Sequence, residues 1–285
     1  MERFRYVVVD VFSQQPLAGN QLAVFTNAQQ IPERLLQPLA KEIGFSETVF
    51  CYPAEAEGHV RIRIFTPASE IPFAGHPTLG TAFVLAAPMQ LGSIGLETGS
   101  GLVTVELERG GSGSIVFGRM GQPLPRIEPF ERAAELLAAL GLKRSELPVE
   151  LYDNGIAHVF IALASEEQVA ALSPDSKALA AFGPVGINCF AGAGKSWKTR
   201  CFVSGLGISE DPATGSAAGP LALHLARHGA VPFGEEIEIR QGEELGRSSF
   251  LYASAHGTSE AVQRIEVGGC AVVVARGEFA LPGAG

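Results

Sequence analysis

The sequence predicts an α+β fold built from two similar β-rich halves, each with its sheet wrapped around one apolar helix. Strand-like runs rich in Val, Ile and Phe outnumber helical patterns and do not alternate with them one for one, as a doubly wound sheet would require. Two motifs with the same P-x-x-G spacing each lead into an apolar helix, and they lie 140 positions apart in a chain of 285 residues. An offset of about half the chain indicates an internal duplication.

The strands and helices predicted from these patterns are bounded by turn residues. The strand-like runs cover residues 6–12, 22–26, 48–52, 59–66, 102–108, 113–118, 158–163, 199–204, 235–240, 263–269 and 271–279. Helices are expected over 32–44, with Pro32 at the first position, and over 128–141, and both end at a glycine. Two more helices start inside the P-x-x-G motifs and run through TLGTAFVLAA and SAAGPLALHLARHG.

The two motifs also match in the strands that precede them. Pro72–Gly75 follows the strand word Arg63-Ile-Phe65, and Pro212–Gly215 follows Arg200-Cys-Phe202. The alternative to a duplication is chance matching of short apolar words.

A Pro- and Gly-containing segment over residues 118–130 marks the boundary between the halves. It predicts an N-terminal half of 1–122 and a C-terminal half of 123–285, with the option that the C-terminal strand returns to the first half. Ligand clefts commonly form where two halves meet, so the functional site is expected between them.

The composition narrows the class of partner. The formal net charge is −9 and no Lys/Arg cluster could neutralise a run of phosphates, so nucleic acid is excluded as a partner. No apolar run is long enough to span a membrane, and the apolar run near the N-terminus is too short for a signal peptide. A cytoplasmic protein with a small-molecule ligand is expected.

The P-x-x-G motifs favour an anion site. The first turn of a helix carries unpaired N–H groups and the positive end of the helix dipole, and Gly75 and Gly215 let the backbone approach a ligand closely. The alternative is that these glycines only form turns into buried helices. The polar residues His76, Asp211 and Ser216 beside the glycines favour a site that grips a small carboxylate.

A candidate proton carrier lies in GFSETVF. Glu47 has Phe45, Val49 and Phe50 around it. Apolar surroundings disfavour the charged carboxylate and are expected to raise the pKa of Glu47, which suits a general acid or base near neutral pH. The alternative is a solvated glutamate at the end of a strand.

These segments together resemble the PhzF-like family of phenazine biosynthesis, which shares the diaminopimelate epimerase fold. The matching segments are DVFSQQPLAGNQLAVF, GFSETVF, RIRIFTPASEIPFAGHPTLGTA, EDPATGSAAGPLALHL and IRQGEELGRSS. The resemblance implies two halves, each a curled, mostly antiparallel sheet around a central helix, and a homodimer. It also implies a cofactor-independent isomerase without a metal, which moves a proton on a small, cyclic amino-carboxylate.

The resemblance assigns roles residue by residue. Glu47 takes the place of the acid/base glutamate of the family, and His76, Asp211 and Ser216 take the places of its other polar site residues. Gly75 and Gly215 stand at the backbone positions near the substrate carboxylate, and Asn20 of AGNQLAV is a further candidate for substrate binding.

Related epimerases use two cysteines, and neither P-x-x-G motif contains one, so two-thiol epimerisation is excluded. A metabolite-binding protein without catalysis and an amino-acid epimerase- or racemase-like enzyme remain as alternatives.

Three other motifs are set aside. AGAGKSW lacks the first glycine of a phosphate loop, because Cys189 stands there, and a hairpin turn fits it better. His224 and His228 have the spacing of a metal pair but lack the glutamate of H-E-x-x-H, so no metal is expected. Ser216 lies outside a G-x-S-x-G elbow, which makes a hydrolase the weaker reading. The four cysteines are expected to be reduced core thiols.

Overall fold

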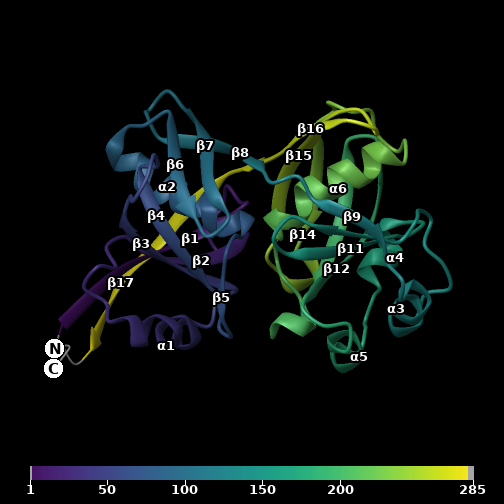
Figure 1. Cartoon of the computed structure of the whole chain (residues 1–285), viewed down its shortest axis with the longest axis horizontal. Helices are drawn as coiled ribbons and strands as arrows, with labels where there is room; N and C mark the ends of the chain where they lie inside the picture. Colours follow the sequence, from purple (N-terminus) through teal and green to yellow (C-terminus); the bar gives the residue numbers. More distant parts are fainter. Residues whose placement is uncertain (1, 282–285) are drawn as a thin grey trace. The chain divides into compact units, whose positions relative to one another are not determined.

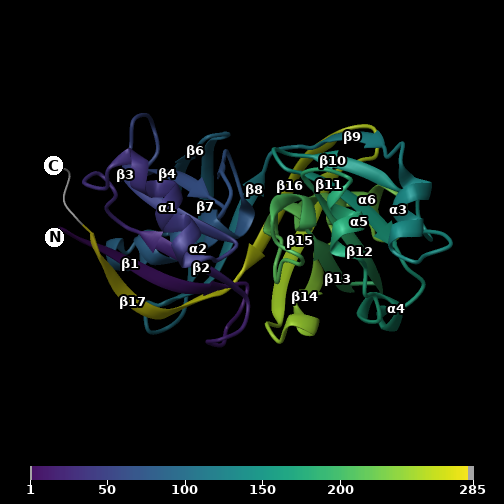
Figure 2. The ribbon, with the colours of Figure 1, turned by 90° about the horizontal axis from the view of Figure 1, so that it is seen from below.

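The chain divides into two compact units, which are described one at a time from a computed structural model covering residues 2–281. The first unit combines Met1–Gly121 with Gly268–Gly285, and the second comprises Gln122–Val267. The C-terminal segment joins the first unit because β17 (Ala271–Leu281) pairs antiparallel with β1 (Glu2–Val11) along their whole length. Figures 1 and 2 both show these two strands, purple and yellow, side by side.

The first unit is a mixed sheet in which β17 and β1 are followed by six longer strands. These are β2 (Asn20–Phe25), β3 (Glu47–Pro53), β4 (Val60–Phe65), β6 (Ser93–Thr98), β7 (Gly101–Arg109) and β8 (Ile115–Gln122). Along this order the successive pairs from β1–β2 to β7–β8 are antiparallel, parallel, antiparallel, parallel, antiparallel and antiparallel. The short β5 (Glu70–Ile71) pairs with β4, and the helices are α1 (Glu33–Ile43) and α2 (Gly75–Met89).

The second unit repeats this order. Its strands are β9 (Arg126–Pro129), β10 (Glu150–Asp153), β11 (Ala157–Ala162), β12 (Val185–Ala193), β13 (Ser196–Phe202), β14 (Ile237–Gln241), β15 (Ser249–Gly257) and β16 (Val262–Gly269). From β10–β11 to β14–β15 the pairs are antiparallel, parallel, antiparallel, parallel and antiparallel, and β9 pairs with β10 as β17 pairs with β1. The predicted α+β fold of two similar halves is confirmed.

The helices of the second unit are one long helix and several short ones. They are α3 (Ala133–Ala139), α4 (Glu166–Ala170), α5 (Ser176–Ala180) and α6 (Gly215–Arg227), with 3₁₀ turns η1 (Ser204–Leu206) and η2 (Glu243–Leu245). Hydrophobic side chains of α3, α4 and α5 pack in one cluster against β11 and β12. In Figure 1, α6 runs beside β15, which it contacts.

The central helix of each unit is mostly apolar because most of its surface is buried. Every residue of α6 except Arg227 is buried, as is the whole first half of α2. Gly80 lets α2 approach its sheet closely, since a Cβ at this position would lie 2.6 Å from Val11 Cγ2 and 2.8 Å from Leu22 Cδ2. The sheet of the first unit is covered on its other side by α1, which packs on Phe25 and Phe50.

The four predicted helices are present, with small differences at their ends. Pro32 is the residue before α1 rather than its first residue, because its backbone is extended (ψ 135°), and α1 ends at left-handed Gly44 (φ 70°). The helix predicted over 128–141 is the shorter α3, followed by left-handed Gly141 (φ 72°). The hairpin predicted at AGAGKSW joins β12 to β13.

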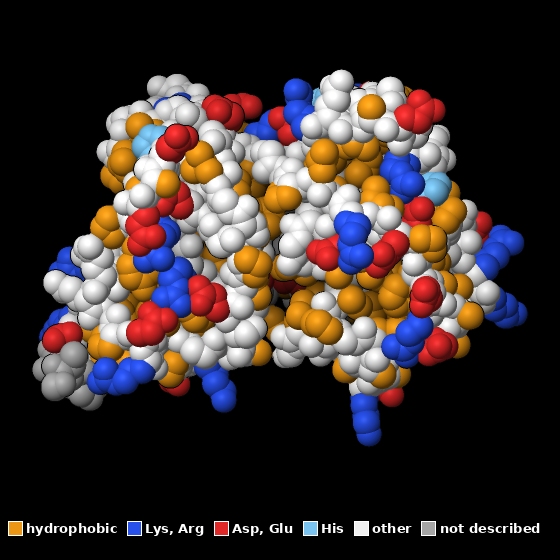
Figure 3. Space-filling view, in the orientation of Figure 1, with side chains coloured by type: hydrophobic (Ala, Val, Ile, Leu, Met, Phe, Trp, Pro, Cys, Tyr) orange, Lys and Arg blue, Asp and Glu red, His pale blue; other side chains and the backbone are white. Residues whose placement is uncertain are grey.

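The four cysteines are free and buried, as predicted. Cys189 lies opposite Arg200 and Cys201 opposite Asn188, so the two thiols of the β12–β13 hairpin are not cross-strand partners. Within residues 2–281 no helix is long and apolar enough to cross a membrane. On the face shown in Figure 3, Lys and Arg side chains lie beside Asp and Glu side chains and form no broad basic field.

Candidate active site

The start of α2 brings three predicted site residues of the first unit together. Glu47 Oε2 lies 3.3 Å from His76 Nε2, and Asn20 Nδ2 lies 3.3 Å from His76 Nδ1. Asn20 is the first residue of β2 and Glu47 the first of β3, and these strands are parallel with Leu22 opposite Glu47. Parallel strands begin at one edge of a sheet, so both side chains meet the second residue of α2 there.

Burial decides the charge state of this cluster. The His76 side chain is 4% exposed and that of Glu47 15% exposed. Burial lowers the pKa of His76 to about 3, against the opposing effect of a backbone hydrogen bond with Gln21. His76 is therefore uncharged near neutral pH. It lies beside the carboxyl group of Glu47 as a neutral imidazole, so the contact does not place a positive charge next to that carboxyl group.

The backbone at the start of α2 is suited to an anion. The residue before the helix, Ala74, is extended (φ −151°, ψ 143°), and its side chain does not cap the helix. The first turn contains Pro77, which has no N–H group, so Gly75 and His76 carry the first amide hydrogens. Gly75 adds no side chain that would keep a ligand away from them.

The second unit holds Asp211 through a set of hydrogen bonds to its loop. Thr214 Oγ1 donates to Asp211 Oδ2 at 2.7 Å. Gln241 Nε2 donates to the Asp211 carbonyl at 2.8 Å and to Thr214 Oγ1 at 2.9 Å, and Gln241 Oε1 accepts from the Thr214 amide at 3.1 Å. Because Gln241 is buried on β14, it fixes both the loop and the hydroxyl that faces the Asp211 carboxyl.

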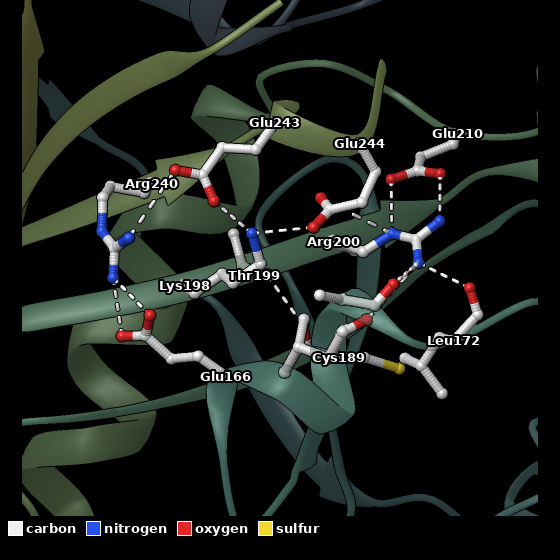
Figure 4. Close-up of polar contacts among 12 residues, drawn as sticks. Glu166, Leu172, Cys189, Lys198, Thr199, Arg200, Glu210, Arg240, Glu243 and Glu244 are labelled. Carbon is white, nitrogen blue, oxygen red and sulfur yellow. Dashed lines mark hydrogen bonds and ion pairs between the residues drawn. The ribbon is translucent and has the colours of Figure 1, made fainter. Parts of the chain in front are cut away.

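A buried ion pair fixes the residue just before Asp211. Arg200 donates from Nε and Nη2 to the two carboxylate oxygens of Glu210 at 2.8 and 2.7 Å, and from Nη1 to the Leu172 carbonyl at 2.6 Å. Figure 4 shows this arrangement. On the other side of the same network Lys198 pairs with Glu243 and Glu244, the latter at 2.8 Å, and Arg240 pairs with Glu166 at 2.6 Å.

The first unit contains the equivalent pair. Arg63 donates from Nε and Nη2 to the two carboxylate oxygens of Glu70, each at 2.7 Å. Glu70 precedes Gly75 by five residues, just as Glu210 precedes Gly215. Ile64 lies opposite Ile71 in the first unit, and Cys201 lies opposite Asp211 in the second. These matches place His76 and Ser216 at equivalent positions, and Ile71 and Asp211 likewise.

Ser216 lies in a buried polar cluster that the sequence did not reveal. Its Oγ is 2.9 Å from His158 Nε2, and its carbonyl accepts a hydrogen bond from Asn154 Nδ2 at 3.1 Å. The carbonyl needs this donor because Pro220, four residues later, has no N–H group. Burial lowers the pKa of His158 to about 4, so this imidazole is also neutral near pH 7.

The two helix starts therefore differ in chemistry. Asn20, Glu47, Gly75 and His76 lie together in the first unit. The start of α6 in the second unit carries Gly215 and Ser216, with Asp211 just before it. In this unit the strand that matches β3 is β12, which begins with Val185 and Gly186. No carboxyl group stands at the strand position that corresponds to Glu47. The expected location of the site between the halves stays a prediction.

The weaker hydrolase reading loses support in the second unit. Ser216 contacts His158, whose other ring nitrogen faces an asparagine amide and not a carboxylate. Asp211 accepts from Thr214. A serine–histidine pair without an acidic third member lacks the group that orients an activating histidine.

His224 and His228 meet a carboxylate that the sequence pattern does not contain. Glu150 Oε2 lies 3.3 Å from His224 Nδ1 and 2.9 Å from His228 Nε2, and among the described residues this trio alone has donor atoms close enough for a metal, within 4.8 Å of one another. Arg227 Nη1 lies 3.1 Å from the same oxygen, and Tyr152 donates to it at 2.9 Å. A guanidinium at this distance competes with a cation, so the cluster fits a hydrogen-bonded network at the end of α6 better than a metal site.

Comparison with known proteins places these features in a family. The sequence profile of phenazine biosynthesis-like proteins matches residues 9–277. The trans-2,3-dihydro-3-hydroxyanthranilate isomerase of Pseudomonas aeruginosa is 50% identical over 273 residues, which cover 96% of this chain and 98% of that protein. The enzyme of the same name from Pseudomonas fluorescens is 48% identical over 276 residues, covering 97% and 99%.

A solved structure shows the same fold. A PhzF-family phenazine biosynthesis protein from Bacillus anthracis superposes with a TM-score of 0.87 over 99% of this chain and 100% of that chain, at 24% identity.

Proposed function

Since the chain belongs to the phenazine biosynthesis-like protein family and is an isomerase, we propose that it isomerises a small cyclic amino-carboxylate of the dihydro-hydroxyanthranilate type. In this proposal Glu47 moves one proton between two carbons of the substrate without a cofactor. The observation that carries the proposal is the contact of Glu47 Oε2 with His76 Nε2, 3.3 Å long, at the uncapped start of α2. A cytoplasmic homodimer stays the expected form of the enzyme.

The proposed step balances with a single carboxyl group. The Glu47 carboxylate takes a proton from a carbon activated by conjugation, and the electron pair of the broken C–H bond moves into the conjugated system. The resulting carboxylic acid returns the proton to another carbon on the same face, which restores the carboxylate. The partly buried position of Glu47 supports this role, because few waters compete for the proton.

The other candidate residues are proposed to hold the substrate. The amides near Gly75 and Gly215 and the side chains of Asn20 and Ser216 would bind its carboxylate, as fixed donors do for anions. His76, being neutral, would form a hydrogen bond through Nε2 with an amine or hydroxyl of the substrate. Asp211 would bind the amine.

An epimerase of the two-base type is less well supported. Such an enzyme needs a second base at the opposite face of the carbon. The strand position that matches Glu47 carries Val185 and Gly186, and the four cysteines are buried, with their thiol pKa values raised by burial. One carboxyl group that takes and returns the proton fits these residues better.

The test is proton transfer in deuterated buffer, followed by NMR. Trans-2,3-dihydro-3-hydroxyanthranilate should be converted by the purified enzyme, and Glu47→Gln should abolish turnover while binding, read from line broadening, persists. Glu42→Gln, at an exposed position of α1, is the matched control and should keep full activity. Turnover by Glu47→Gln at the native rate would overturn the role of Glu47. If the native enzyme does not convert the compound, the proposed substrate class is wrong.

A further inference from the structure

The contacts of His158 determine which of its ring nitrogens carries the proton. Asn188 Nδ2 lies 3.4 Å from His158 Nδ1 and donates to the Gly186 carbonyl at 3.0 Å. The carbonyl can only accept, so the Asn188 side chain must present its NH₂ group on this side. The same NH₂ group then faces Nδ1 of the ring, which has to act as the acceptor.

A neutral imidazole with an acceptor at Nδ1 carries its proton on Nε2. His158 Nε2 is the atom 2.9 Å from Ser216 Oγ. The ring therefore donates a hydrogen bond to the serine oxygen. The serine hydroxyl cannot donate to His158 Nε2, because this nitrogen already carries a proton. Among the contacts of the described residues, Ser216 Oγ has His158 as its hydrogen-bond partner and no other, so its proton is left for a bound ligand.

The surroundings of His158 leave the ring little freedom to turn. The side chain is 1% exposed, and a Cβ at Gly186 would lie only 2.4 Å from His158 Nδ1. The pairing of β11 with β12 sets this contact, because His158 lies opposite Gly186 and two residues from the position opposite Asn188. A ring flip would break the contacts of both nitrogens at once.

From these contacts we infer that His158 and Asn188 form a positioning pair, which turns the hydroxyl proton of Ser216 toward the carboxylate of the substrate. His158 acts through Ser216 and does not touch the reacting atoms. The inference rests on the proposed function, in which Ser216 binds substrate, and it adds the direction of the hydrogen bond and the two residues that fix it. A serine that accepts from a buried N–H donor is also a better donor to an anion, since hydrogen bonds in a chain polarise one another.

The tautomer can be tested without any substrate. In protein labelled with ¹⁵N in its histidine rings, the His158 signals are identified by their loss in His158→Gln. At pH 7 they should show a protonated Nε2 and an unprotonated Nδ1. In Asn188→Asp, which offers an acceptor to Nδ1, this pattern should be lost. A protonated Nδ1 in the native protein, or an unchanged pattern in Asn188→Asp, would overturn the inference.

The consequence for the enzyme is tested by kinetics with trans-2,3-dihydro-3-hydroxyanthranilate. His158→Leu, which removes the donor, should raise KM about tenfold with little change in kcat, equal to about 1.4 kcal/mol of binding. His158→Gln should restore most of the native KM, because its amide nitrogen can donate from about the place of Nε2. In a Ser216→Ala background, His158→Leu should add no further loss.

The controls separate failure of the inference from failure of the proposed function. His224→Gln changes another fully buried histidine of the second unit, and it should lower the melting temperature without raising KM. If Ser216→Ala leaves KM unchanged, the binding role of Ser216 is wrong, whatever the tautomer. If Ser216→Ala raises KM but His158→Leu does not, Ser216 binds substrate without the help of His158 and the inference alone is overturned.

Discussion

Arg200 and Glu210 form a two-pronged ion pair immediately before Asp211, with both side chains less than 10% exposed. The equivalent pair of the first unit, Arg63 and Glu70, has the same two contacts but is 21% and 43% exposed. In both pairs the glutamate lies five residues before the glycine that opens a central helix. The same kind of ion pair thus fixes the segment before each central helix. Its contribution to the free energy of unfolding is expected to differ between the two units.

Removing one partner of the buried pair should be costly. Arg200→Met leaves the Glu210 carboxylate buried without its main partner, and a loss of about 3–5 kcal/mol in the free energy of unfolding is expected. Arg63→Met should cost about 1 kcal/mol or less, because solvent reaches Glu70. Urea unfolding of the two variants measures the difference, and equal losses would contradict this account.

The stability of the second unit should fall on mild acidification. Burial lowers the pKa of His158 to about 4, whereas an unfolded histidine titrates near 6.5. At a pH between these two pKa values, the histidine is protonated in the unfolded chain and neutral in the folded chain. The free energy of unfolding therefore decreases as the pH falls from 6.5 to 4, by about 1.4 kcal/mol per pH unit for this group.

The contribution of His158 is isolated by comparing variants. Urea unfolding at pH 7, 6 and 5 should give a shallower pH dependence for His158→Gln than for the native protein, by that same slope below pH 6.5. His76, with a pKa lowered to about 3 by burial, keeps its own contribution in both proteins. Parallel curves would mean that His158 is not held neutral.

Gly186 should tolerate no side chain. A Cβ there would lie 2.4 Å from His158 Nδ1 and 2.9 Å from its Cε1, so Gly186→Ala must displace a ring that is packed on all sides. A loss of about 1–3 kcal/mol is expected. Gly92→Ala is the matched control, because a Cβ at Gly92 meets nothing within 4 Å. Thermal unfolding of both variants tests the prediction, and an unchanged Gly186→Ala protein would show that the ring can move.

Zinc should not stabilise the native protein. Glu150 Oε2 already faces Arg227, Tyr152 and two histidines, and the guanidinium repels a dication. The melting temperature is expected to stay the same with added Zn²⁺ or with a chelator. A rise with zinc that is lost in His228→Gln would identify a metal site and contradict this interpretation.

The helix ends and turns were predictable because their signals act within a few residues. Gly44 and Gly141 adopt left-handed backbone conformations that glycine favours, and each ends its helix as expected. Apolar runs marked most of the longer strands, and the matched P-x-x-G motifs marked both central helices. The short strands β9 and β10, which lack a clear apolar run, were missed, and so were the longer strands β6 and β15.

The partners of the candidate site residues could not be predicted in the same way. The short sequence matches around Arg63 and Arg200 indicated the duplication. They did not indicate which glutamate pairs with each arginine, because the spacing from arginine to glutamate differs between the units. His158 and Asn188 lie on parallel strands that are far apart in sequence, and Gln241 reaches Asp211 from a third strand.

The sequence by itself determined the kind of fold, the places where the chain turns and the residues that resemble those of a known family. Only the tertiary structure decided which polar side chains meet. The physical reason is that backbone preferences are local, whereas a hydrogen bond between side chains depends on the register of strands that the packing of the whole unit selects. The proton on His158 is a case in point, because it is fixed by an amide 30 positions away.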